Sequence, residues 1–167
     1  GAIQEDYTVR VAEARLEPPP AFLLTLIQGL PKGEKLELVL QKGTELGIGR
    51  FMPTQMQRSV GRLKPEREQN RLERWQKIVR EAARQSRQPY LPQLQFEQRL
   101  EDALVKVDAE LKLLLWEESG QPLNRLLPQQ PPRGIAVIVG PEGGIAPEEA
   151  AAAERAGYLP VSLGPRI

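Results

Sequence analysis

The chain has 167 residues, 40% of them apolar, and it contains neither cysteine nor histidine. Without cysteine it can form no disulfide, catalytic thiolate or zinc–thiolate site, and without histidine it lacks the usual general base and the commonest metal ligand. We therefore expect no metal, and chemistry carried by carboxylates, Arg, Lys, hydroxyl groups or the backbone.

No apolar run in the sequence approaches the roughly 20 residues that a membrane-spanning helix needs. The N-terminus also lacks the basic and apolar regions of a secretion signal. These features predict a cytoplasmic protein without a membrane partner.

The formal net charge of +1 conceals an uneven distribution along the chain. Residues 50–90 contain 11 Lys or Arg and 4 Asp or Glu, a net +7, whereas both flanking segments are net acidic. This local excess of positive charge predicts a surface that binds a polyanion.

Residues 7–14 alternate as a strand does, with Tyr7, Val9 and Val11 on one side. A single strand is not stable alone, so we interpret residues 1–17 as the remnant of an N-terminal domain. The three prolines that follow Glu17 form a stiff linker. The second domain then occupies residues 18–167.

Within that domain, apolar runs predict strands at residues 22–30, 50–54, 94–96, 111–116, 135–139 and 159–163. Helical spacing predicts helices at 34–46, 65–86, 100–107 and from Pro147 to Gly157, with a helical turn at 122–127. Strands that alternate with helices indicate an α/β fold, with a mostly parallel sheet and helices on both faces. Gly43, in mid-helix, indicates either close packing or a ligand.

The predicted helix at 65–86 is the clearest element, because its apolar residues fall on one face. The opposite face carries basic residues and nearly lacks alternating acids, its basic residues being Arg74, Lys77, Arg80, Arg84 and Arg87. Two interpretations remain open and have equal weight. The face is either a solvated surface or a set of phosphate contacts.

A glycine-rich loop, residues 140–144 with the sequence Gly-Pro-Glu-Gly-Gly, follows the strand at 135–139. Gly164 and Pro165 follow the last strand in a similar way. Loops at the carboxyl ends of neighbouring strands are where an open α/β sheet binds its ligand. The loop matches neither the phosphate-binding P-loop nor the dinucleotide pattern. Glu142 would repel a triphosphate, so we favour a ligand with an adenosine and a positive centre over a purely structural turn.

Four blocks of sequence carry a resemblance to a known family. They are residues 30–47 (Leu-Pro-Lys-Gly to Gln-Lys-Gly-Thr-Glu-Leu-Gly), 57–59 (Gln-Arg-Ser), 74–86 (Arg-Trp-Gln-Lys-Ile to Glu-Ala-Ala-Arg-Gln-Ser) and 139–167 (Val-Gly-Pro-Glu-Gly-Gly to Leu-Gly-Pro-Arg-Ile). In order and spacing they resemble the 16S ribosomal RNA uridine-N3 methyltransferases, the RsmE family of the SPOUT superfamily.

The resemblance implies a SPOUT-type α/β domain with a C-terminal trefoil knot that binds S-adenosylmethionine, and a homodimer. It also implies that residues 1–17 belong to a PUA-like β-barrel. The family continues past the position of Ile167 with a helix that threads the knot, so we expect the knot to be incomplete in this chain. The family also has a hydroxyl side chain at the position of Ala146, so the following helix loses a cap.

The resemblance also assigns roles to individual residues. It places the cofactor on backbone groups of Leu115, Gly140, Gly144, Leu163, Gly164 and Ile167. Arg58 and Arg166 become candidates for stabilising negative charge on uracil during transfer, although a phosphate contact or structural ion pair fits each arginine equally well. Glu142 and Glu45 are the carboxylates that could accept the N3 proton. The RNA-binding set is Arg58, Arg74, Lys77, Arg80, Arg84 and Arg87.

We therefore expect an S-adenosylmethionine-dependent methyltransferase that acts on N3 of a uridine in the ribosomal RNA of the small subunit. Two alternatives remain open from the residues. One is a non-catalytic RNA-binding module, in which the glycine loop is only a turn. The other is an enzyme that binds a phosphorylated ligand at the same loop.

Overall fold

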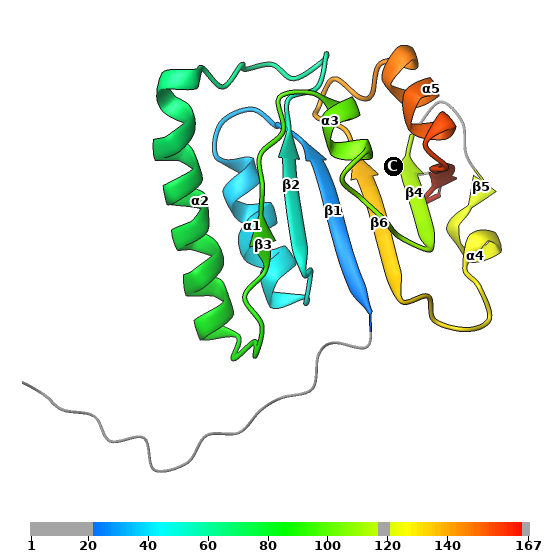
Figure 1. The fold of residues 1–167 in the computed structure, drawn as a ribbon, viewed down its shortest axis with the longest axis horizontal. Helices are drawn as coiled ribbons and strands as arrows, with labels where there is room; N and C mark the ends of the chain where they lie inside the picture. Colours follow the sequence, from blue (N-terminus) through cyan, green and yellow to red (C-terminus); the bar gives the residue numbers. More distant parts are fainter. Residues whose placement is uncertain (1–21, 117–120, 165–167) are drawn as a thin grey trace, which may run out of the picture.

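A computed structural model describes residues 22–116 and 121–164 as alternating strands and helices (Figure 1). The strands are β1 (Leu23–Gly29), β2 (Arg50–Thr54), β3 (Gln93–Leu94), β4 (Leu111–Leu115), β5 (Gln121–Pro122), β6 (Gly134–Val139) and β7 (Leu159–Ser162). The helices are α1 (Lys35–Glu45), α2 (Pro65–Gln85), α3 (Leu100–Leu104), α4 (Leu123–Leu126) and α5 (Pro147–Arg155). The predicted strand at 7–14 and the domain remnant at 1–17 lie outside the described residues.

The described strands form one parallel sheet in the order β3-β2-β1-β6-β4-β7-β5. At its centre, Ile138 of β6 lies opposite Ile27 of β1 on one side and Leu114 of β4 on the other. The last strand, β7, lies between β4 and β5, with Val161 opposite both Leu115 and Gln121. The predicted parallel sheet is confirmed.

Successive strand residues point to opposite faces of the sheet, and each face has its own core. The core of the first face comprises Leu26, Leu30, Leu36, Leu40, Phe51, Trp75 and Val79, so α1 and α2 cover that face. The core of the other face includes Ile27, Met52, Leu100, Ala103, Ile138, Ala150 and Ala153, so α3 and α5 cover it (Figure 1). Helices on both faces are therefore confirmed.

The α1–α2 layer explains the glycine in the middle of α1. A Cβ atom at Gly43 would lie 2.7 Å from Phe51 Cε1 of β2 and 2.8 Å from Ile48 Cδ1. Such distances are shorter than any normal carbon contact, so only glycine lets α1 approach the sheet this closely. Of the two roles left open by the sequence, Gly43 serves close packing.

Three short elements differ from the prediction. The α3 helix ends at Leu104 instead of residue 107, and Val107 still packs into the core although it follows the helix. The β3 strand is Gln93–Leu94 instead of 94–96, and its backbone pairing continues through Gln95 and Glu97. The two-residue β5 was not predicted, because Gln121 and Pro122 carry no strand pattern.

Candidate functional site

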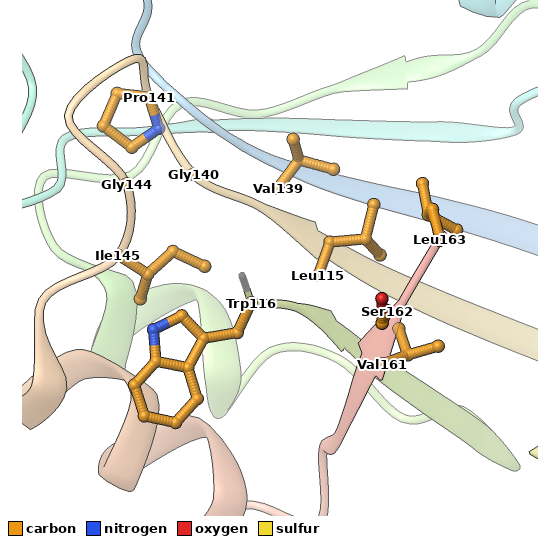
Figure 2. Close-up of a pocket in the computed structure, with 10 residues that line it drawn as sticks. All are labelled: Leu115, Trp116, Val139, Gly140, Pro141, Gly144, Ile145, Val161, Ser162 and Leu163. Atoms are coloured by element: carbon orange, nitrogen blue, oxygen red, sulfur yellow. The ribbon is translucent and has the colours of Figure 1, made fainter. Parts of the chain in front are cut away.

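A cavity of about 220 Å³ lies where β4, β6 and β7 end (Figure 2). We call it the strand-end cavity. Its walls are Leu115, Trp116, Val139, Gly140, Pro141, Gly144, Ile145, Val161, Ser162 and Leu163. Because these three parallel strands are neighbours, their following loops meet at one edge of the sheet.

The strand-end cavity brings together four of the six residues that the resemblance implies for the cofactor. Leu115, Gly140, Gly144 and Leu163 all line it. Gly164 follows Leu163 without lining the wall, and its φ of 116° requires glycine. Ile167 lies outside the described residues, as does Arg166.

The glycine loop at residues 140–144 is a tight turn that closes one side of this cavity. The backbone N–H of Gly144 donates to the carbonyl of Pro141 at 2.9 Å, and Gly144 has a φ of 75°, a conformation that side chains disfavour. A Cβ atom at Gly140 would lie 2.7 Å from Ile145 Cγ1. Both glycines are therefore needed for the fold of the loop.

Glu142 projects from this turn toward the loop between β1 and α1. Its carboxylate forms an ion pair with Lys35 Nζ at 2.6 Å and accepts the backbone N–H of Lys32 at 3.1 Å. The Lys35 ammonium, followed by backbone N–H donors, lowers the pKa of Glu142 to about 2. A carboxylate with this pKa is a weak proton acceptor at neutral pH, so the arrangement favours an anchoring role for Glu142.

The loop of residues 55–64, which we call the Arg58 loop, packs on the other side of the glycine loop. Arg58 Nη1 donates to the carbonyl of Gly143 at 3.3 Å. A Cβ atom at Gly143 would lie 2.9 Å from the Arg58 carbonyl oxygen, and one at Gly29 would lie 2.6 Å from Pro141 Cδ. Arg58 therefore lies against the glycine loop, but it does not line the strand-end cavity.

Glu149 of α5 connects the Arg58 loop to the end of the segment that follows the glycine loop. Its side chain is 3% exposed. Oε1 accepts the backbone N–H of Gln57 at 2.9 Å, and Oε2 accepts that of Ala146 at 3.3 Å. Glu149 thus supplies one half of a capping box, the bond to the N–H of the N-cap residue Ala146, while the hydroxyl bond that Ala146 cannot make is absent.

The walls of the strand-end cavity are apolar side chains and backbone, with the Ser162 hydroxyl as a further polar group. No charged side chain lines it among the described residues. The indole Nε1 of Trp116 is buried and has no hydrogen-bond partner in the described part of the chain. Such a site suits a ligand that is bound by backbone groups and apolar contact, and it offers nothing to a triphosphate.

Sequence reasoning missed six of the wall residues as ligand contacts, namely Trp116, Val139, Pro141, Ile145, Val161 and Ser162. The available signal was their position, since most of them lie at or close after the carboxyl end of a predicted strand. Apolar residues at that position are indistinguishable from core residues in the sequence. Only the sheet order brings them to one cavity.

The basic residues of α2, and Arg87 just after it, do not form the cationic face that the sequence suggested. Arg74 forms ion pairs with Glu37 at 2.7 Å and Glu34 at 3.0 Å, both from the neighbouring α1 region. Arg84 pairs with Glu81 one turn earlier. Within the described residues, Lys77, Arg80 and Arg87 are exposed and have no ion-pair partner. The acids that neutralise Arg74 are distant in sequence, so a helical projection of α2 cannot reveal them.

Other groups considered from the sequence lie away from this edge. Glu45, in the last turn of α1, pairs with Lys42 at 2.8 Å and does not line the strand-end cavity. In the described residues, no cluster of three or more His, Cys, Asp or Glu is placed to hold a metal ion. No described helix has the length and apolar content needed to span a membrane.

Comparison with known proteins agrees with this geometry. A family model described as an RNA methyltransferase domain matches residues 18–167. The curated ribosomal RNA small subunit methyltransferase E of Mycobacterium bovis is 36% identical over 155 residues, covering 90% of this chain and 59% of that protein. The protein of the same name from Synechocystis sp. is 41% identical over 150 residues, covering 86% of this chain and 48% of that protein. The chain thus spans about half to three fifths of the length of these relatives.

Two solved structures share the fold. A protein of Legionella pneumophila, solved in complex with the bound cofactor SAM, has a TM-score of 0.81 and 32% identity over 88% of this chain and 60% of that one. Ribosomal RNA small subunit methyltransferase E from Neisseria gonorrhoeae, bound to S-adenosyl methionine, has a TM-score of 0.78 and 33% identity over 87% of this chain and 59% of that one. From the family match over residues 18–167 and this shared architecture, the chain belongs to the RNA methyltransferase domain family.

Proposed function

We propose that this chain transfers a methyl group from S-adenosylmethionine to N3 of a uridine in the 16S ribosomal RNA of the small subunit. The observation that carries the proposal is the strand-end cavity, with the glycine loop as one wall, in a chain of the RNA methyltransferase domain family. The names of the relatives, and the S-adenosyl methionine bound to one of them, support the same function. If ribosomal RNA is the substrate, the protein acts in the cytoplasm.

The residues present fit this cofactor. An adenosine carries a flat apolar ring and a sulfonium carries a positive charge, so a cavity with apolar walls, backbone carbonyls and no lining cation suits both. Trp116 lines the cavity, and its buried indole N–H has no partner in the described part of the chain. We assign the binding to Leu115, Gly140, Gly144 and Leu163, with Gly164 and Ile167 as the adjoining residues on the family pattern.

When bound, the cofactor supplies a methyl group on a positively charged sulfur. This chain has to bring the uracil into line with it and stabilise the negative charge that develops as the N3 proton leaves. Arg58 lies against the glycine loop through Gly143 and is exposed toward solvent, so we assign it to that charge. Arg166, outside the described residues, is proposed for the same task. Among the catalytic candidates from the sequence, Glu142 fits better as the residue that positions the glycine loop.

The RNA itself is proposed to bind across Arg58, the exposed cations of α2 and Arg87, which follows that helix. Lys77, Arg80 and Arg87 are available for phosphate contacts, whereas Arg74 and Arg84 would first have to exchange their carboxylate partners. Exchange is feasible because both arginines are exposed, as are Glu34 and Glu81, and exposed ion pairs contribute little stability. We therefore expect the former group to contribute more to RNA affinity than the latter.

The trefoil knot, the homodimer and the N-terminal PUA-like barrel are further parts of the proposal. The sheet order supports the knot, because β7 lies between β4 and β5, which are close in the chain. A strand inserted between two such neighbours is the arrangement that a threaded C-terminal segment requires. The barrel and the dimer rest on the family resemblance alone.

Calorimetric titration with S-adenosylhomocysteine tests the proposed cofactor site. We expect heat of binding for the unmodified chain and its loss in Gly144→Val, because the added side chain strains a φ of 75° on the cavity wall. Gly47→Val is the matched control, since it imposes the same change at a φ of 88° away from this cavity. Binding that survives in Gly144→Val would contradict the proposed site.

Methyl transfer to small-subunit ribosomal RNA tests the activity. We expect Arg58→Gln to lower the transfer rate by about 100-fold, as for the loss of one group that stabilises a transition-state charge, while S-adenosylhomocysteine binding persists. No heat of binding in any variant, together with retained RNA binding, would favour a non-catalytic RNA-binding module.

A further inference from the structure

A second cavity of about 170 Å³ lies on the α1–α2 side of the sheet and shares no wall residue with the strand-end cavity. We call it the Trp75 cavity. Its walls come from the loop after β1, the first turn of α1, residues 60–63 of the Arg58 loop, and Arg71 and Trp75 of α2. Three separate segments of the chain thus converge on it.

The charged residues on the described walls of the Trp75 cavity are all cations, namely Lys32, Arg62 and Arg71. Arg71 has a weak partner, with Nη1 3.9 Å from Glu37 Oε1. Lys32 and Arg62 are exposed, and neither has an ion-pair partner within the described residues. The cavity therefore carries a positive charge that the surrounding described residues leave largely uncompensated, which favours an anionic ligand.

Trp75 adds an independent sign of a missing acceptor. Its side chain is 3% exposed and its ring packs against Phe96, with 6.3 Å between the ring centroids. The indole Nε1 is nevertheless without a hydrogen-bond partner in the described part of the chain. Buried donors are nearly always paired in folded proteins, and Trp75 with this unpaired donor is part of the same wall as the cations.

The Trp75 cavity is also tied to the proposed site of methyl transfer. The backbone N–H of Lys32, a wall residue, donates to Glu142 of the glycine loop at 3.1 Å. The Arg58 loop supplies Arg62 to this cavity and Arg58 to the glycine loop. A polyanion whose reacting group lies at the glycine loop would therefore pass close to the Trp75 cavity.

We propose that the Trp75 cavity binds a backbone phosphate of the RNA, close to the nucleotide that is methylated. Lys32 and Arg62 pair with the phosphate oxygens, and the Trp75 indole N–H donates to one of them. This inference rests on the proposed function, because it takes the polyanion to be the RNA substrate. It adds a phosphate site that the exposed cations of α2 do not include.

The indole N–H groups allow a direct test by nuclear magnetic resonance. The chain has only two tryptophans, so a ¹⁵N-labelled sample gives one indole signal for each cavity, and Trp75→Phe assigns them. We expect an oligouridylate to shift the Trp75 signal and S-adenosylhomocysteine to shift the Trp116 signal. No change at Trp75 at saturating oligouridylate would overturn the phosphate site, and a shift with inorganic phosphate but not with RNA would overturn its assignment to RNA.

The two signals also separate this inference from the proposed function. A Trp116 response to S-adenosylhomocysteine with a silent Trp75 signal in the RNA titration would leave the methyl-donor site intact and remove the phosphate site. A Trp75 response to RNA without any Trp116 response would support the phosphate site and count against the donor site.

A charge substitution tests the site without disturbing the core. Arg62→Gln should weaken oligouridylate binding about tenfold and reduce the slope of log K against log salt by about 0.7, the value for one lost phosphate contact on a single strand. Arg133→Gln is the matched control, because it removes the same charge just before β6, at the opposite edge of the sheet. Equal losses in both variants would indicate a general charge effect and overturn the proposal.

Discussion

At the scale of single residues, the surroundings of two side chains shift their pKa values, and each shift can be tested. Glu142 is held by Lys35 and Lys32, and its pKa is lowered to about 2. Burial raises the pKa of Tyr158 to about 12, and its hydroxyl has no hydrogen-bond partner in the described residues. Each shift has a defined consequence for the pH dependence of stability.

Glu142→Gln should lower the free energy of unfolding at neutral pH, because the amide loses the ion pair with Lys35. A depressed pKa stabilises the folded state above the ordinary value of 4.5, and this contribution is lost as the pH falls toward about 2. The free energies of unfolding of the variant and the native chain, measured with urea, should therefore become equal as the pH falls through that range. Glu154→Gln, an exposed carboxylate without a partner in the described residues, should show no such convergence.

Tyr158→Phe should leave the free energy of unfolding unchanged or raise it by about 1 kcal/mol, because it removes a buried hydroxyl that lacks a partner. A raised pKa also means that the native chain loses stability as the pH rises from 10.0 toward about 12, since the unfolded state ionises first. This alkaline loss should be smaller in the variant. Urea unfolding at neutral and alkaline pH measures both effects, and a clear destabilisation at neutral pH would show that the hydroxyl is satisfied.

At the scale of elements, the site depends on three loops that touch without room for a Cβ atom. The end of β1 contacts the glycine loop at Gly29, and the Arg58 loop contacts it at Gly143. Glu149 then fixes the Arg58 loop to the start of α5. The position of the cavity wall is therefore set by backbone contact between elements, more than by any one side chain.

Gly29→Ala should destabilise the fold by about 1–3 kcal/mol, because a methyl group 2.6 Å from Pro141 Cδ and 2.8 Å from Met56 Sδ forces the loops apart. It should also weaken S-adenosylhomocysteine binding, since Pro141 is a wall residue. Gly61→Ala is the matched control, where nothing lies within 4 Å of the added atom. Thermal unfolding and calorimetry measure the two effects, and equal behaviour of both variants would contradict the packing argument.

At the scale of the whole molecule, the two proposed ligands bind regions of different charge. Residues 50–90 carry the net excess of +7, whereas the described walls of the strand-end cavity carry no charged side chain. The field of the basic segment acts on the RNA through many contacts and reaches the smaller ligand only weakly.

Salt should therefore affect the two ligands differently. The affinity for single-stranded RNA should fall steeply with salt, with a slope of about −0.7 for each phosphate contact. The affinity for S-adenosylhomocysteine should change little over the same range. Fluorescence anisotropy for RNA and calorimetry for the small ligand provide the measurements, and parallel salt curves would mean that the two ligands share one charged site.

The sequence predicted local structure well and long-range contacts poorly. The β2 strand has the predicted bounds, α1 and β1 are one residue shorter than predicted at each end, and α2 is one residue shorter at its C-terminal end, because apolar periodicity within one element is enough to define it. The partners of Arg74 and Glu142 are far away in the chain, so no local pattern contains them. The place of β7 between β4 and β5 is likewise a property of the sheet alone.

The candidate site was predicted through two routes. Strand ends with glycine loops indicated the correct edge of the sheet, and the family resemblance selected Leu115, Gly140, Gly144 and Leu163 on the cavity wall. The resemblance itself is confirmed by the family match. Neither route indicated Trp116 or the Trp75 cavity, because an indole without a partner can be recognised only in three dimensions.

The interior place of β7 has a consequence for how the protein acquires its function. This strand is made after both of its neighbours, yet it supplies Val161 and Ser162 to the cavity and pairs with strands on both sides. A nascent polypeptide that has emerged only through β6 has just two of the three converging strand ends. The strand-end cavity is therefore incomplete until β7 pairs with β4 and β5, so the onset of the proposed small-ligand binding during refolding should report that pairing.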